Sequence, residues 1–120
     1  DQQCTIALLQ RTLHYVPYEA AIECLRALHT FGCERLFLSL SGLGSSLAGY
    51  YEAREAPLRE RFATLTPVGQ ELFSAYEPLC LYSQLEAYEL VTAAGWYVDT
   101  LHTTDFGNHQ VIARPTGVHK

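Results

Sequence analysis

A short segment near the start of the chain combines a buried strand, a polar turn and an amphipathic helix. The apolar run Thr5-Ile6-Ala7-Leu8-Leu9 is typical of a buried strand. It is followed by Gln10-Arg11-Thr12 and, after Pro17, by a helical pattern that places Ala21 and Leu25 on one stripe. Proline suits a first helical turn because the N–H that it lacks would have no helical partner there. This order predicts an open α/β sheet, in which ligands bind beyond the carboxyl ends of the strands.

The rest of the chain continues the pattern and ends in a hairpin. Ser83 and Glu86 form a capping box that opens a helix, and Gly107-Asn108 tolerates the positive φ of a turn. Pro57 and Pro67 interrupt a less regular stretch, which we interpret as a helical insertion over the end of the sheet. The expected elements are a strand over 4–10, a helix over 17–31, a strand over 35–41, an insertion over 42–82 with helices at 51–63 and 67–76, a helix over 83–94, and strands over 96–106 and 110–114.

Composition limits the function classes. The chain has 120 residues, of which 48% are hydrophobic and 18% charged, enough for one domain with a real core. Its net charge of −5 argues against nucleic-acid binding by charge. Arg54, Arg59 and Arg61 alternate with glutamates, which is typical of a solvated helix face. No apolar run approaches the roughly 20 residues needed to cross a bilayer, so we expect no membrane association.

Cysteine and histidine patterns carry little chemistry. Cys4, Cys24, Cys33 and Cys80 lack metal-ligand spacing, which favours reduced structural thiols and a cytoplasmic protein, with one disulfide as the alternative. The start of the chain has no signal-peptide pattern. His102 and His109 flank the expected hairpin turn, where surface polar residues are commoner than a metal site, so we expect no metal.

Two motifs and their order resemble a known family. Leu13-His14-Tyr15-Val16-Pro17 is similar to the turn after the fourth strand of class I S-adenosylmethionine-dependent methyltransferases, and Ala94-Gly95-Trp96 is similar to the entry to their sixth strand. The resemblance implies the second half of a Rossmann-like sheet, β-α-β-(helical insertion)-α-β-β with a terminal antiparallel hairpin. Residues 1–120 would then be one partial α/β domain, and 42–82 a lid within it.

The resemblance also implies an enzyme that moves a methyl group from S-adenosylmethionine to an O, N or C nucleophile of a small molecule. The family's glycine-rich cofactor loop has no match before Asp1, and Gly42-x-Gly44 is a poor substitute because Leu47 stands where a third glycine belongs. The first strand would also be an apolar edge that invites pairing. We therefore expect an N-terminal segment, a complementary chain or a homodimer through the first strand to complete the site.

Seven residues are candidates for the site. His14 is the expected catalytic residue because an imidazole can accept a proton near neutral pH, although it can also simply pack on its helix. Gln10 and Arg11 are expected to contact the cofactor, and Ser41 and Gly42 the substrate. Tyr50 and Tyr51 are expected to stack on the substrate, with buried cover for a core as the alternative.

Two other functions fit the same sequence. One is a non-catalytic α/β binding or assembly module. The other is a complete small α/β domain with an anion site at residues 42–46. No G-x-S-x-G elbow is present, so the sequence gives no support for hydrolysis.

Overall fold

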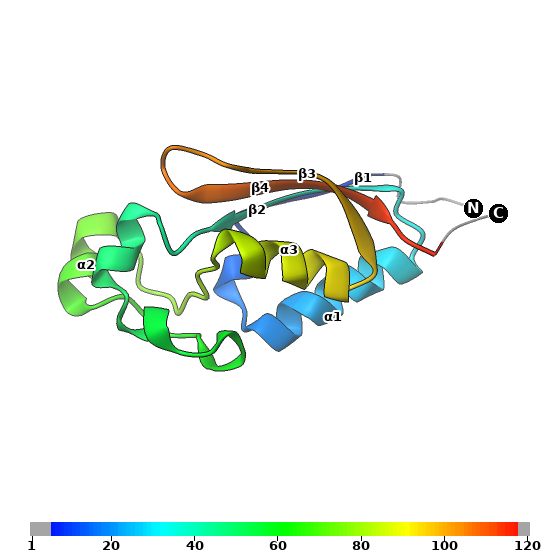
Figure 1. The fold of residues 1–120 in the computed structure, drawn as a ribbon. Helices are drawn as coiled ribbons and strands as arrows, with labels where there is room; N and C mark the ends of the chain where they lie inside the picture. The colour runs from blue at the N-terminus through cyan, green and yellow to red at the C-terminus, as the bar shows by residue number, and fades with distance from the viewer. Residues whose placement is uncertain (1–5, 118–120) are drawn as a thin grey trace.

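A four-stranded mixed sheet forms one layer of the molecule (Figure 1). A computed structural model describes residues 6–117. The strands are β1 (Ile6–Gln10), β2 (Arg35–Ser41), β3 (Trp96–Thr103) and β4 (Asn108–Pro115), in the spatial order β1-β2-β4-β3. β1 and β2 are parallel, whereas β4 runs antiparallel to both β2 and β3. The expected α/β order with a terminal antiparallel hairpin is therefore confirmed for the described residues.

Two helices cover one face of this sheet (Figure 1). α1 (Tyr18–Thr30) buries Ala21 and Leu25, as its apolar stripe predicts. α3 (Gln84–Ala93) begins with the complete Ser83–Glu86 capping box. Between helices and sheet, the core is closed by Trp96, whose Nε1 donates to the carbonyl of Leu25 at 3.0 Å.

Within residues 6–117, no helix covers the opposite face of the sheet (Figure 1). Alternation along β1 and β2 sends Ala7, Leu36 and Leu38 into the core and their neighbours outward. Ile6 and Leu8 are therefore 60% and 67% exposed. We call this surface the uncovered face; its apolar members are Ile6, Leu8, Phe37 and Ile112. Parallel strands are normally covered on both faces, so this surface is unusual for the β1–β2 pair.

The insertion has a different construction from the expected one. In place of a helix over 51–63, the chain forms two short 3₁₀ turns, Glu52–Glu55 and Leu58–Glu60, and a third, Ser46–Tyr50, precedes them. The second expected helix is present as α2 (Pro67–Phe73). These elements enclose a small core of their own, formed by Ala48, Tyr51, Leu65, Leu79 and Leu81.

Arg61 corrects the prediction of a solvated basic face. It is only 5% exposed and donates from Nη1 to the Leu81 carbonyl at 2.8 Å and to Glu86 at 2.6 Å. Its Nη2 donates to the second Glu86 oxygen at 2.9 Å. Arg61 thus joins the insertion to α3.

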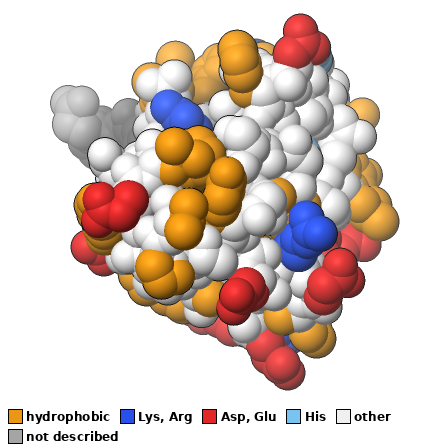
Figure 2. Space-filling model, turned by 90° about the vertical axis from the view of Figure 1, so that its left-hand side faces the viewer, with side chains coloured by type: hydrophobic (Ala, Val, Ile, Leu, Met, Phe, Trp, Pro, Cys, Tyr) orange, Lys and Arg blue, Asp and Glu red, His pale blue; other side chains and the backbone are white. Residues whose placement is uncertain are grey.

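The end of the molecule that carries the insertion faces the viewer in Figure 2, where apolar side chains form a patch. Val68 and Leu72 are the exposed apolar residues of α2.

The cysteines differ in state. Cys33 is disulfide-bonded, whereas Cys24 and Cys80 are free. The expectation that all four cysteines are reduced is therefore wrong, and the alternative of one disulfide holds; Cys4 lies outside the described residues. Within residues 6–117, no helix combines the length and the apolar character that spanning a membrane requires.

Candidate functional site

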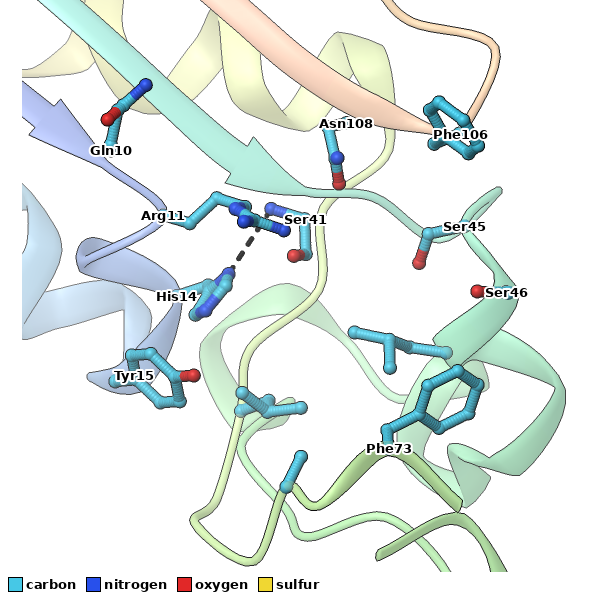
Figure 3. A pocket seen from close by; sticks show the side chains of 13 residues that line it. Gln10, Arg11, His14, Tyr15, Ser41, Ser45, Ser46, Phe73, Phe106 and Asn108 are labelled. Carbon is cyan, nitrogen blue, oxygen red and sulfur yellow. Dashed lines mark hydrogen bonds between the residues drawn. The ribbon is translucent and has the colours of Figure 1, made fainter.

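A cavity of about 620 Å³ opens at the carboxyl ends of β1 and β2 (Figure 3). The loop after β1, the insertion and the tip of the β3–β4 hairpin form its walls. It is lined by Gln10, Arg11, His14, Tyr15, Ser41, Ser45, Ser46, Leu47, Phe73, Ala75, Leu79, Phe106 and Asn108. Ligands of open α/β sheets bind at this end of the strands, so the cavity is the candidate site.

Arg11 leaves β1 in an unusual backbone conformation. Its φ is +48°, in the left-handed region that a non-glycine residue rarely adopts. Two hydrogen bonds hold it there, because its N–H donates to both the carbonyl (2.9 Å) and the hydroxyl (3.0 Å) of Ser39. The side chain points from the end of β1 toward Ser41 at the end of β2 (Figure 3). Arg11 therefore brings a fixed positive charge to the mouth of the cavity.

His14 lies on a 3₁₀ turn, Leu13–Tyr15, that follows β1. Its carbonyl accepts from the Cys80 N–H at 2.8 Å, and its Nδ1 accepts from the Ser41 N–H at 3.3 Å. The ring is 4% exposed, and its Nε2 is buried without a hydrogen-bond partner among the described residues. A buried polar atom without a partner is uncommon and calls for an explanation.

Burial and a neighbouring charge also set the protonation of His14. Desolvation, followed by the positive charge of Arg11, lowers the pKa of His14 to about 4. The ring is therefore neutral at pH 7. Because Nδ1 accepts from Ser41, the single ring proton resides on Nε2. In this tautomer the free nitrogen is a donor.

The structure brings together four of the seven predicted residues. Gln10, Arg11, His14 and Ser41 all line the cavity. Gly42 does not line it: a Cβ there would lie 2.2 Å from the Gly107 carbonyl oxygen and 2.6 Å from His109 Nε2. Gly42 is thus required for close packing of the hairpin at the end of β2, and its expected contact with substrate stays a prediction.

The structure places Tyr50 and Tyr51 outside the lining of the cavity. Tyr51 is 2% exposed, and its hydroxyl donates to the Leu79 carbonyl in the core of the insertion. Tyr50 packs edge-on against Phe73, with ring centroids 5.7 Å apart, and does not line the cavity. This packing fits the alternative of cover for a core, and stacking of the pair on a substrate stays a prediction.

Several lining residues escaped sequence reasoning. Phe73 comes from α2, and Phe106 and Asn108 come from the hairpin, far along the chain from His14. A turn pattern predicted the bend at Gly107 but could not show that the bend reaches the ends of β1 and β2. Ser45 and Ser46 had been considered only as a possible anion loop.

His109, on β4 of the hairpin, has a hydrogen-bond partner for each ring nitrogen. His109 is 3% exposed, with Nε2 2.7 Å from the Tyr82 carbonyl and Nδ1 2.9 Å from the Thr103 hydroxyl. Its ring joins the hairpin to the segment that precedes α3, and it is not a surface residue. Within residues 6–117, no cluster of three or more histidine, cysteine, aspartate or glutamate side chains is arranged to hold a metal ion.

Comparison with known proteins identifies the fold. No protein-family model and no curated protein matches the chain. A solved SAM-dependent methyltransferase from Methanosarcina mazei has a TM-score of 0.65 at 16% identity, covering 96% of this chain and 63% of that one. The chain has the fold of the class I S-adenosylmethionine-dependent methyltransferases.

Two further structures share this methyltransferase fold. An O-methyltransferase family 2 protein from Planctomyces limnophilus, solved with apigenin, has a TM-score of 0.62 at 17% identity, covering 97% of this chain and 31% of that one. Human N-acetylserotonin methyltransferase, solved with SAM, has a TM-score of 0.59 at 17% identity, covering 92% and 29%. The chain spans less than two thirds of the length of each of the three.

Proposed function

We propose that this chain is the substrate-side part of an S-adenosylmethionine-dependent methyltransferase that acts on an O, N or C nucleophile of a small molecule. The observation that carries the proposal is the cavity at the carboxyl ends of β1 and β2, where Arg11, His14 and Ser41 converge. In-line approach of a nucleophile to a methyl group needs little more than positioning, which such a cavity supplies. The neighbouring structures support the same chemistry by their fold.

The arrangement of the sheet supports the proposal that a further segment or chain packs against β1. β1 has one strand neighbour within residues 6–117, and Ile6 and Leu8 are exposed on the uncovered face. Crossovers between parallel strands are right-handed, and β1–α1–β2 has its helix on the covered face. A helix that packs on the uncovered face must therefore belong to a crossover whose strands progress across the sheet in the opposite direction, away from β1. A reversal of winding at the free edge of β1 is a topological switch point, where ligands bind. Gln10 and Arg11 lie at the carboxyl end of that edge.

The described residues fit only part of the cofactor. Gln10, His14 and Ser41 line the cavity in which we expect the transferable methyl and the acceptor to meet, and the unpartnered Nε2 of His14 is consistent with a polar ligand there. Residues 6–117 offer no glycine-rich loop at a strand end to hold the rest of the cofactor, because the hairpin occupies the space beside Gly42. The partner that completes the sheet, whether an N-terminal segment, a complementary chain or a second copy, would supply that loop.

Calorimetric titration of S-adenosylhomocysteine into the chain alone, and into the complete encoded protein or complex, tests this function. We expect binding only when the sheet is completed. Leu8→Glu, on the uncovered face, should abolish that binding by preventing docking. Leu85→Glu is the matched control, because Leu85 is 64% exposed on α3 and away from this face.

The outcomes separate the candidate functions. Binding that survives Leu8→Glu would show that the uncovered face takes no part in completing the site. If S-adenosylhomocysteine binds neither the chain nor the complete protein, the methyltransferase proposal is wrong, and a non-catalytic binding or assembly module becomes the better interpretation.

A further inference from the structure

We propose that the acceptor bound in the cavity is an aromatic carboxylate, which is methylated on a carboxylate oxygen. This inference rests on the proposed methyl transfer and adds the chemical class of the acceptor. It comes from three features of the cavity: its charge, the tautomer of His14 and its aromatic wall.

The charge of the cavity is positive and unbalanced. Arg11 is the one charged side chain among the thirteen lining residues, and none of them is an aspartate or glutamate. The planar guanidinium of an arginine can bind a carboxylate through two parallel hydrogen bonds. A cationic acceptor would meet repulsion from Arg11 with no compensating anion. The cavity therefore selects a negatively charged ligand.

The direction of Arg11 assigns that charge to the acceptor rather than to the cofactor. Its backbone N–H is hydrogen-bonded to Ser39 on the neighbouring strand β2, and its side chain points toward Ser41 (Figure 3). We expect the cofactor at the edge of β1 that faces away from β2, which is the opposite side of β1 from the Arg11 side chain. Arg11 thus faces the part of the cavity enclosed by the insertion and the hairpin.

His14 offers a donor instead of a base. Its Nδ1 lone pair is occupied by the Ser41 N–H, so accepting a proton on Nε2 requires the ring to change tautomer and lose that bond. Arg11 is the charged group beside the ring, Tyr15 packs edge-on against it at 4.3 Å, and no lining carboxylate can take up a proton. An acceptor that needs deprotonation, such as an alcohol or phenol, is poorly served. A carboxylate arrives already ionised at neutral pH.

The opposite wall of the cavity is apolar and partly aromatic. Figure 3 shows Phe73 and Phe106 on the side of the cavity away from His14, and Tyr15 beside His14. Leu47 and Leu79 are further apolar lining residues. Phe106 is 81% exposed, so it has room to close on a ligand. Flat aromatic rings fit such walls by edge-on or offset contacts. A planar ring with one carboxylate matches a cavity that has a single cation at one end and aromatic side chains at the other.

The chemical step balances without a base. A carboxylate oxygen attacks the methyl carbon of the sulfonium, and a C–O bond forms as the C–S bond breaks. The bonding pair moves to sulfur, which becomes a neutral thioether. The negative carboxylate and the positive sulfonium give a neutral methyl ester and S-adenosylhomocysteine, and no proton is released. Arg11 and the Nε2–H of His14 position the carboxylate for this attack.

Binding of a matched pair of ligands tests the charge argument without the cofactor. We expect 2-naphthoate to bind the protein at least about tenfold more tightly than the isosteric 2-naphthamide, as for a charge-assisted hydrogen bond. Arg11→Gln should remove that preference, whereas Arg26→Gln, which deletes an exposed arginine on α1, should keep it. Equal affinities, or absence of naphthoate binding, would overturn the assignment and leave the cofactor question to the S-adenosylhomocysteine titration.

The source of the bound carboxylate is tested separately, because the cofactor's methionine moiety also carries one. In the complete protein, Arg11→Gln should weaken naphthoate and leave the preference for S-adenosylhomocysteine over 5′-methylthioadenosine unchanged. Loss of that preference with naphthoate binding intact would assign Arg11 to the cofactor and refute the proposal.

Product analysis and a His14 variant decide the chemistry. With S-adenosylmethionine, 2-naphthoate should give methyl 2-naphthoate, and 2-naphthol should give no ether; ether without ester would overturn the proposal. His14→Gln keeps an amide N–H donor, so it should retain the rate of ester formation within about tenfold. The dependence of that rate on pH, in the range where both proteins are folded, should be unchanged. A loss of about 10²–10⁴-fold would mean that His14 acts as a general base.

Discussion

The α/β layer and the insertion are held together by different interactions. The layer has a large apolar core in which α1 and α3 pack on the sheet. The separate core of the insertion has five buried apolar side chains, and the insertion has few helical hydrogen bonds and polar side chains that reach main-chain carbonyls. Apolar contacts in the layer are many and individually small, whereas the fastening of the insertion depends on a few specific groups. Single polar substitutions should therefore damage the insertion more than the layer.

Breaking the Arg61–Glu86 pair should have the largest effect. The paired hydrogen bonds from Arg61 raise its own pKa, and although burial alone would raise the pKa of Glu86, the bonds from Arg61 and Ser83 outweigh it and lower that pKa. Arg61→Met leaves Glu86 without its cation and frees the Leu81 carbonyl. We expect the free energy of unfolding to fall by about 4 kcal/mol, measured by urea denaturation.

An exposed pair gives the control for this substitution. Arg59 and Glu19 form an ion pair with side chains that are 65% and 62% exposed. Arg59→Met should cost less than about 1 kcal/mol, as exposed ion pairs do. Similar losses in the two variants would contradict the view that Arg61 anchors the insertion.

The junction between the two regions should respond to pH through His14. Its pKa is lowered to about 4 in the folded protein, against 6.5 for the ordinary value. Between these values the unfolded chain binds more protons, so stability is complete above pH 6.5 and declines as the pH falls toward 4. The full difference corresponds to about 3 kcal/mol. Urea midpoints from pH 7 to 4.5 measure it.

His14→Gln should flatten this pH dependence, because the titrating ring is gone while an amide can still bond to Ser41. His102→Gln, at an exposed position of β3, controls for the removal of one histidine. Glu86 complicates only the lowest pH values, because its contribution is lost below its ordinary pKa of 4.5. An unchanged slope in His14→Gln would show that His14 is not the residue that couples stability to pH.

The contrast between the regions also explains what the sequence could predict. Strand β2 and helix α3 were placed correctly because burial imposes periodicity on one face, and because Ser83 and Glu86 form a local capping signal. The 3₁₀ turns of the insertion follow no apolar period. Arg61 resembled a surface residue because its partner lies 25 positions away.

The candidate site divides in the same way. Gln10, Arg11, His14 and Ser41 follow their strands directly, so strand ends predicted them. Gly42, Tyr50 and Tyr51 lie outside the cavity lining because their environment is set by the hairpin and the small core, which are distant in sequence. Phe106 and Asn108 were missed for the same reason.

The smallest expected effect compares two helix caps. The Ser83 hydroxyl accepts from the Glu86 N–H at 3.1 Å at the start of α3, and the Thr66 hydroxyl accepts from the Gly69 N–H at 3.2 Å at the start of α2. Replacing either residue with alanine should cost about 1 kcal/mol. The two losses should differ in location, because α3 packs into the main core whereas α2 covers only the insertion.

Native-state hydrogen exchange distinguishes these locations. Ser83→Ala should lower protection across α1, α3 and the sheet together, because their amides exchange through global unfolding. Thr66→Ala should lower protection in α2 and the adjacent turns and leave β2 unchanged. Equal loss of protection in β2 for both variants would show that the insertion and the layer unfold as one unit. The insertion could then not open over the cavity independently of the sheet, and ligand entry would have to rely on the exposed Phe106 side of the cavity.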